Sequence, residues 1–149
     1  MSDRSRLQPG DAAAAIIVLD DGRYLLQLRD DKPGIFFPAY WGLFGGAVEP
    51  GEQPADTLRR ELKEELDLTV DSPRPLSHFA FDLAPMGLPR IYREYFEVQL
   101  PAAALPSLKL GEGEVFEAFS REQALALPRV TPYDAFALWL HANRFRLEA

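Results

Sequence analysis

The segment that most constrains the fold of this chain is residues 46–68, where a glycine-rich loop leads directly into an acidic helix. Residues 54–66 predict that helix, because Pro54 suits a first turn and apolar side chains recur at helical spacing, at Ala55, Leu58, Leu62 and Leu66. Glycines bracket the loop before it, so its backbone can approach the start of the helix closely. The fold must therefore bury one stripe of this helix and keep the loop beside its first turns.

The same helix carries three carboxylates on one face. Glu61, Glu64 and Glu65 stand at i, i+3 and i+4, and on a helix this spacing makes them neighbours that converge. Like charges so placed weaken a helix by about 0.2–0.5 kcal/mol per pair, and a compensating cation is the natural explanation. The chain has no cysteine, and carboxylate oxygens suit Mg²⁺ or Mn²⁺ better than Zn²⁺. The sequence thus predicts a Mg²⁺ site, with Mn²⁺ as the alternative ion.

Three further groups belong with these carboxylates. Arg60 follows Asp56 by four residues and precedes Glu64 by four, so it can pair with either carboxylate and help to orient Glu64. A backbone carbonyl of the glycine loop can serve as an additional metal ligand. Glu52, just before the helix, can reach the same cluster.

The rest of the chain predicts a mixed sheet flanked by helices. Two strands, 12–19 and 23–29, are joined by an Asp-Gly turn. Further strands are expected at 76–83, 91–100 and 115–119. Ser120 is expected to cap a short helical turn, and Thr131-Pro132-Tyr133-Asp134 resembles a capping box that opens a final helix through Arg144. There is no regular βαβ rhythm and no repeat, so we expect one α/β domain over residues 1–149.

Charge and composition exclude several classes of protein. The chain has 16 Lys+Arg against 23 Asp+Glu, a net charge of −7, which argues against a partner with a polymeric phosphate backbone. An acidic protein can still bind a small polyphosphate through a divalent cation. The sequence shows neither a signal peptide nor an apolar run of bilayer length, so we expect a cytoplasmic protein without a membrane partner. Homodimerisation is an open alternative, because no segment specifies an interface.

At this point a family resemblance becomes visible. Residues 46–68 resemble the Nudix box, G-x5-E-x7-R-E-U-x-E-E-x-G-U with U an aliphatic residue. The specified positions are filled by Gly46, Glu52, Arg60, Glu61, Leu62, Glu64, Glu65 and Leu68. Only Asp67 departs, where the family has glycine. Asp tolerates a left-handed conformation better than most residues, so we expect this departure to cost little stability.

The resemblance implies an α/β/α sandwich and hydrolysis of a phosphoanhydride bond. It implies that Glu61, Glu64 and Glu65 coordinate Mg²⁺, with the carbonyl of Gly45 beside them and Glu52 nearby. It also implies a glutamate from a late loop as ligand or general base. Glu112 is the best placed, with Glu114 and Glu117 as alternatives.

The substrate is decided outside the box. The expected substrate is a nucleoside diphosphate linked to another moiety, with a nucleotide sugar or ADP-ribose favoured; Pro85 lies one place beyond the position at which relatives that cut ADP-ribose have proline. The alternatives are an (oxidised) nucleoside triphosphate and a sensor domain that binds nucleotide without cutting it. Arg29 is a candidate contact for substrate phosphate, and the aromatic candidates for stacking on a base are Trp41, Phe44, Tyr92 and Tyr95. His78 and His141 are assigned no role.

Overall fold

The computed structural model describes residues 11–35, 37–87, 90–109 and 115–147. Within these ranges seven strands form one mixed sheet in the order β3-β2-β1-β6-β5, with β4 paired to β1 and β7 paired to β2. β1 and β6 are parallel, and the other pairs are antiparallel. The strands are β1 Ala12–Leu19, β2 Tyr24–Leu28, β3 Trp41–Gly42, β4 Phe44–Ala47, β5 Arg74–Phe81, β6 Ile91–Leu100 and β7 Val115–Phe119.

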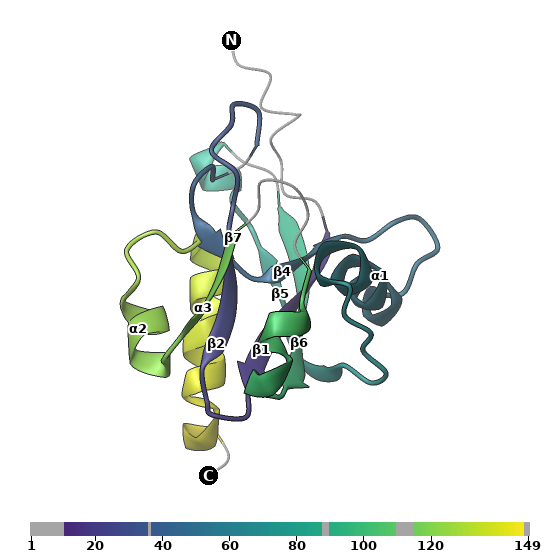
Figure 1. Ribbon diagram of the computed structural model, residues 1–149. Coiled ribbons are helices and arrows are strands. Elements are labelled where there is room, and N and C mark those ends of the chain that lie inside the picture. The colour runs from purple at the N-terminus through teal and green to yellow at the C-terminus, as the bar shows by residue number, and fades with distance from the viewer. Residues whose placement is uncertain (1–10, 36, 88–89, 110–114, 148–149) are drawn as a thin grey trace.

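Helices cover both faces of this sheet (Figure 1). α1 (Pro54–Leu66) lies on one side, and α2 (Arg121–Ala126) and α3 (Pro132–Ala142) lie on the other. Short 3-10 turns occupy Ala84–Met86, Ala102–Ser107 and Arg144–Arg146. The predicted α/β/α sandwich with a mixed sheet is confirmed. No helix in the described part of the chain is long and apolar enough to cross a membrane.

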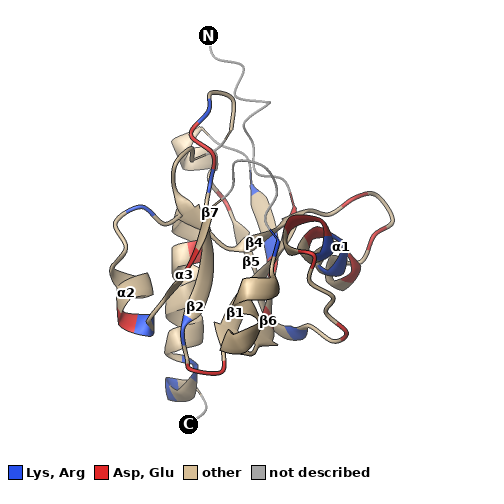
Figure 2. Cartoon of the chain, in the orientation of Figure 1, with Lys and Arg blue, Asp and Glu red and all other residues tan. Residues whose placement is uncertain are grey.

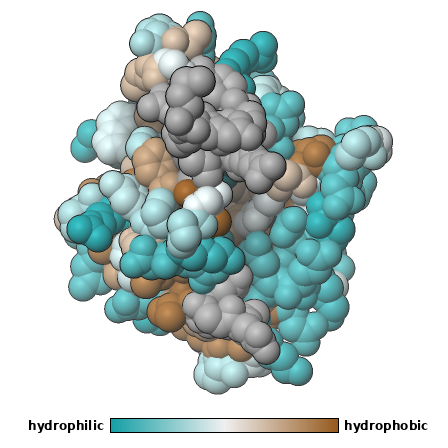
Figure 3. All heavy atoms as spheres, turned by 90° about the horizontal axis from the view of Figure 1, so that it is seen from above, coloured by the Kyte–Doolittle hydropathy of each residue, from teal (hydrophilic) through white to brown (hydrophobic). Residues whose placement is uncertain are grey.

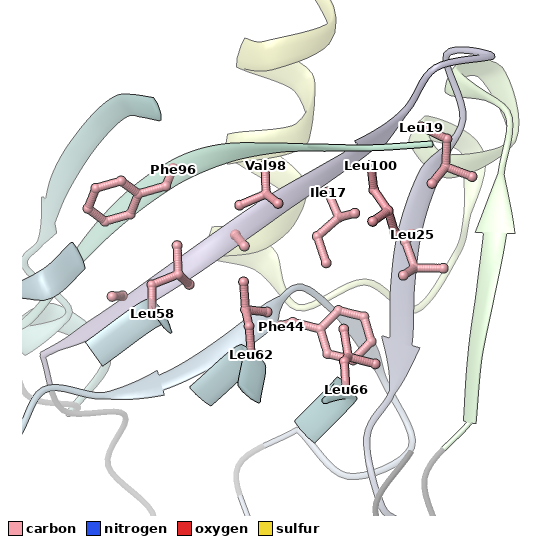
Figure 4. Close-up of a cluster of buried hydrophobic side chains, with 12 residues drawn as sticks. Ile17, Leu19, Leu25, Phe44, Leu58, Leu62, Leu66, Phe96, Val98 and Leu100 are labelled. Carbon is pink, nitrogen blue, oxygen red and sulfur yellow. The ribbon is translucent and has the colours of Figure 1, made fainter. Parts of the chain in front are cut away.

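The central strand β1 explains why two apolar layers form. Its side chains alternate between the two faces, so Ala13 and Ile17 pack toward α1 while Ala14 and Ile16 pack toward α3. A strand covered on both faces reads as a continuous apolar run, as residues 12–19 do. On the α1 side the helix stripe inserts into the core (Figure 4), and its members are fully buried at Leu58, Leu62 and Leu66.

Most element boundaries agree with the sequence predictions, and the differences have physical causes. β1, α1, β6 and β7 begin and end where predicted, whereas β5 is displaced by two residues to Arg74–Phe81. β3 and β4 were not predicted as strands, because a glycine-rich segment has no alternating pattern and pairs only when β1 and β2 are present.

The start of α3 differs from the predicted capping box. The hydroxyl of Thr131 donates to Asp134 Oδ2 at 2.8 Å, and its backbone N–H donates to the carbonyl of Trp41 at 2.9 Å. A capping box instead needs the hydroxyl to accept from the helix backbone. The helix also ends at Ala142, before the predicted Arg144.

Candidate active site

Two glycines of β4 bring the sheet into contact with α1. A Cβ placed on Gly46 would overlap the carboxylate of Glu61, so glycine is what allows this carboxylate to lie on the strand. Gly45 has φ +153, and a Cβ there would overlap the carbonyl of Ala13 on the neighbouring strand. The close approach of loop and helix that the glycines predicted is therefore present. The proposed role of the Gly45 carbonyl as a metal ligand stays a prediction.

Arg60 is the centre of the polar network on α1. Its Nε and Nη2 donate to the two oxygens of Glu52 at 2.9 and 3.0 Å, a bidentate pair. Its Nη1 donates to Glu61 Oε1 at 3.0 Å and lies 3.6 Å from Glu64 Oε2. The predicted pairing with Glu64 is present. The alternative pairing with Asp56 is wrong, because Asp56 pairs with Arg59 at 2.8 Å.

Glu52 is held more tightly than the sequence suggested. Besides Arg60, its Oε1 accepts from the hydroxyl of Thr57 at 2.6 Å and from the backbone N–H of Glu49 at 3.1 Å. The hydrogen bonds from Arg60, then from Thr57, lower the pKa of Glu52 to about 2. Both oxygens are engaged, so Glu52 is the partner of Arg60 in this geometry, and a contact of Glu52 with the metal stays a prediction.

The three carboxylates of the helix share a face but differ in exposure. The side chain of Glu61 is 17% exposed and that of Glu64 is 59% exposed, while Glu65 is half-buried. Acidic residues gather on α1 and the loop before it (Figure 2), and the α1 side of the molecule is mostly hydrophilic in the view from above (Figure 3).

These carboxylates fit a hard cation by the chemistry of their oxygens, although they do not converge as predicted. Among the described residues no three Asp, Glu, His or Cys side chains lie close enough to hold a metal ion as they stand. Glu61 and Glu64 are instead both directed at Arg60 Nη1, at 3.0 and 3.6 Å, and their like charges repel. Oxygen donors on one helix face, with Glu61 seated against Gly46, are the kind of ligand that Mg²⁺ accepts.

At the end of α1, Asp67 takes the left-handed conformation, while its small cost in stability stays a prediction. It caps the helix with φ 53 and ψ 34, in the left-handed region, and its backbone N–H bonds to the carbonyls of Leu62 and Lys63. Its carboxylate pairs with Lys63 at 2.6 Å, which lowers its pKa. Asp therefore takes the conformation for which the family uses glycine.

Of the three candidates for the late glutamate, only Glu117 lies within the described residues. Glu112 and Glu114 lie outside the described residues. Glu117 is exposed in β7 between Phe116 and Ala118, which pack against the α1 side of the core, so its own side chain points to the opposite face. The alternative that assigned the late glutamate to Glu117 is therefore wrong.

Two of the predicted substrate residues, Arg29 and Trp41, lie near the β3 segment. Arg29 Nε donates to the carbonyl of Phe37 at 3.3 Å, and its Cδ would lie 3.8 Å from a Cβ on Gly42. Trp41 packs edge-on against Phe119 with ring centroids 5.0 Å apart. Trp41, a member of the α3-side cluster, is thus separated by the sheet from the carboxylates of α1. The substrate contacts of both residues stay predictions.

Among the other aromatic candidates, only Tyr92 is on the α1 side and partly exposed. Its hydroxyl donates to Glu94 Oε1 at 2.8 Å, and its ring lies 5.7 Å from that of His78. Phe44 is 0% exposed and Tyr95 is 1% exposed. Neither ring offers a surface to a substrate, so stacking by Phe44 or Tyr95 is wrong; both are core residues.

Two buried polar networks on the α3 side of the sheet were not predicted from the sequence. Asp134 accepts from the backbone N–H of Leu43 at 3.1 Å and from the hydroxyl of Tyr95 at 3.2 Å, and lies 3.7 Å from Arg93 Nη2. That guanidinium stacks 4.3 Å above the ring of Tyr133. An apolar helix with one acidic residue in its first turn gives no signal for such a role.

The second network centres on His141, which is 0% exposed. Its Nδ1 lies 2.7 Å from the hydroxyl of Tyr24 and its Nε2 lies 2.7 Å from Glu97 Oε2. Burial lowers the pKa of His141, although the hydrogen bond to Glu97 opposes the shift. Burial raises the pKa of Glu97, but hydrogen bonds from His141 and Gln99 outweigh it, so the net shift is downward. This network joins α3 to β2 and β6.

Comparison with known families decides the relationship of this chain. A family model described as NUDIX domain matches residues 9–140, most of the chain. The chain belongs to the Nudix family. The Gly46, Arg60 and Glu61 arrangement is therefore that of a Nudix box in a Nudix fold.

Solved structures of other proteins have the same fold. A MutT protein from Methanosarcina mazei Go1 superposes with a TM-score of 0.74 at 20% identity, covering 94% of this chain and 96% of that one. A mutT/nudix family protein from Listeria innocua superposes with a TM-score of 0.74 at 24% identity, covering 96% and 98%. The ORF135 protein of E. coli does so with a TM-score of 0.68 at 26% identity, covering 94% of each.

Curated relatives match over a short stretch. The nucleoside triphosphatase NudI of Escherichia fergusonii is 52% identical over 50 residues, which cover 34% of this chain and 35% of the relative. NudI of Escherichia coli O1:K1 / APEC is 50% identical over 50 residues, with the same coverage. The chain thus spans about a third of the length of the curated relatives it matches.

Proposed function

We propose that this Nudix protein is a Mg²⁺-dependent hydrolase that uses one water molecule to cut a nucleoside triphosphate into a nucleoside monophosphate and inorganic pyrophosphate. The observation that carries the proposal is the close contact of the Glu61 carboxylate with Gly46. Arg60 adds hydrogen bonds to Glu61 and Glu52. It also forms an ion pair with Glu64. A helix that served only as a solvated surface has no need of a glycine strand shaped to receive one of its carboxylates.

In this function the carboxylates of α1 hold the cation and Arg60 holds the carboxylates. Glu61, Glu64 and Glu65 supply negatively charged oxygens, and Arg60 limits their repulsion and sets their directions. These three carboxylates would hold Mg²⁺, which when bound would supply Lewis-acid stabilisation of the charge on the phosphate. A carboxylate accepts the proton of the attacking water. The family resemblance makes Glu112 the candidate for this role or for a further metal ligand.

The choice of a triphosphate changes the expectation from the sequence. That expectation favoured a nucleotide sugar or ADP-ribose, with nucleoside triphosphates as the alternative. The relatives in Escherichia carry the name nucleoside triphosphatase, and this supports the alternative. Nothing in the described geometry favours the nucleotide sugar.

The test is a screen of the purified protein with Mg²⁺ against nucleoside triphosphates, oxidised nucleoside triphosphates and nucleotide sugars, with the products separated chromatographically. We expect a nucleoside monophosphate and inorganic pyrophosphate from a triphosphate, and a loss of turnover of at least about 10²-fold in Glu64→Gln. Glu122→Gln is the matched control, because Glu122 is 75% exposed on α2, across the sheet. Turnover of nucleotide sugars alone would overturn the choice of substrate, and binding of nucleotide without any turnover would favour the sensor.

A further inference from the structure

A buried hydroxyl lies on α1 one turn before Arg60 and Glu61. Thr57 is 0% exposed, in a helix whose other buried residues are leucines. Burying a hydroxyl is unfavourable unless it is hydrogen-bonded, and threonine is a weaker helix former than alanine or leucine. The hydroxyl of Thr57 therefore needs a hydrogen-bond partner that compensates for the cost of its burial.

That partner is Glu52. Thr57 Oγ1 lies 2.6 Å from Glu52 Oε1 and 3.3 Å from the carbonyl of Gln53. A hydroxyl has one proton to donate, and the shorter contact to a charged acceptor takes it. The hydrogen bond is therefore a short, charge-assisted bond to a residue that precedes the helix.

The Thr57–Glu52 hydrogen bond fixes the position of Glu52 relative to the helix, which the Arg60–Glu52 pair alone does not fix. Both of those side chains end flexible stems, so their bidentate pairing fixes each relative to the other but not relative to the helix. Thr57 has a short, stiff side chain anchored in the helix interior. Helical side chains lean toward the N-terminus, which brings Arg60 and Glu61 over the turn that carries Thr57.

The same carboxylate oxygen joins the two interactions. Glu52 Oε1 accepts from both Thr57 and Arg60 Nη2. From Arg60 the chain of contacts continues through Nη1 to Glu61 and Glu64. A displacement of Glu52 therefore moves the guanidinium that orients two carboxylates of the box.

We propose that Thr57, which is not one of the specified positions of the Nudix box, is a positioning residue that locks Glu52 and Arg60 and so sets the directions of Glu61 and Glu64. Its effect on catalysis rests on the proposed function, but its effect on Arg60 does not. We call the Thr57–Glu52–Arg60 set of hydrogen bonds the lock. The lock holds the Arg60 guanidinium in place before any cation or substrate binds.

The experiment compares Thr57→Val, which keeps the shape and removes the hydroxyl, with Thr57→Ser, which keeps the hydroxyl. The first readout is the exchange rate of the Arg60 Nε–H with water, followed by NMR without metal. The second is the affinity for Mn²⁺ alone, followed by electron paramagnetic resonance. We expect Thr57→Val to speed the exchange and weaken Mn²⁺ binding by about tenfold each, and Thr57→Ser to stay within about twofold of the wild type.

Thr131→Val is the matched control. Thr131 is 1% exposed and also donates to a carboxylate, Asp134, but across the sheet from α1. A general loss of stability would move both valine variants alike, whereas the lock predicts an effect from Thr57 only. Thr57→Ala, with less bulk and a better helix propensity, gives the same expected losses if the valine variant folds poorly.

The outcomes separate this inference from the proposed function. Wild-type values for both readouts in Thr57→Val, or equal losses in Thr57→Ser or Thr131→Val, would overturn the role of the hydroxyl. Absence of turnover in the wild type, together with the expected change in Arg60 exchange, would overturn the proposed hydrolase and leave the lock standing.

Discussion

Gly45 and Gly46 are adjacent in β4, but a Cβ added at each would overlap different atoms. We therefore expect alanine to affect mainly activity at one position and mainly stability at the other. In Gly46→Ala the added Cβ meets the end of the flexible Glu61 side chain, which can turn aside. We expect stability to fall by less than about 1 kcal/mol and turnover to fall about 10²-fold, because the carboxylate is displaced. In Gly45→Ala the added Cβ meets the backbone of Ala13 at a positive φ, and we expect a loss of roughly 2–4 kcal/mol.

Urea denaturation and initial rates measured on the same preparations check this contrast. A Gly46→Ala variant with full activity would show that Glu61 need not lie against the strand. A Gly45→Ala variant as stable as the wild type would show that the backbone of β1 yields easily at this point.

At the level of single residues, sequence patterns predicted the members of the site better than their partners. Helical spacing placed Glu61, Glu64 and Arg60 on the correct element. The same spacing also suggested Asp56 as a partner of Arg60, but Glu52 takes that position eight residues away. A hydrogen bond across a turn depends on the path of the loop, which has no periodicity to indicate it.

Among the elements, the start of α3 depends on one buried carboxylate. Asp134 joins the helix to the β3–β4 segment through Leu43 and to β6 through Tyr95 and Arg93. We expect Asp134→Ala to destabilise the protein by about 3–5 kcal/mol, because it leaves Arg93 buried without its counter-charge. Tyr95→Phe removes one hydrogen bond only and should cost about 1 kcal/mol.

The urea midpoint of both variants measures this difference. Equal midpoints for Asp134→Ala and Tyr95→Phe would show that Asp134 contributes no more than a single hydrogen bond. The sequence located this helix from its apolar content but gave its first turn the wrong hydrogen bonds. Threonine and aspartate at positions 131 and 134 suit a capping box and also suit hydrogen bonds to other elements. Only the contacts with Trp41 and Leu43 distinguish the two arrangements.

For the whole molecule, the buried network of Tyr24, His141 and Glu97 predicts how stability depends on pH. Burial holds the pKa of His141 below its ordinary value of 6.5, and Arg144, 3.5 Å from Nδ1, disfavours the charged ring further. The unfolded chain then binds this proton more readily than the folded one. Stability is therefore complete above pH 6.5 and falls as the pH decreases below that value.

Thermal unfolding between pH 8 and pH 5 checks this dependence. The wild type should lose melting temperature below pH 6.5, and His141→Gln should have a flatter profile over the same range. Glu52 and Glu97, whose pKa values are also lowered, contribute only as the pH falls below about 4.5, so they do not obscure the comparison. Parallel profiles for the two proteins would contradict the role given to His141.

At this scale the sequence predicted the architecture well, because the apolar run of β1 and the stripe of α1 each require a covered face. It could not predict how two faces of one sheet divide the functional candidates. Trp41 lies across the sheet from the carboxylates of α1, and this separation follows from the pairing of β2, β3 and β7. Such pairing joins segments far apart in the sequence.

The most direct test of the central claim is the binding of Mn²⁺ to the wild type, Glu64→Gln and Glu65→Gln, followed by electron paramagnetic resonance without substrate. The carboxylates of α1 are the proposed ligands, so each variant should bind the ion at least about tenfold more weakly than the wild type. Glu122→Gln should bind it as the wild type does. Equal affinity in all four proteins would contradict the assignment of the cation to α1.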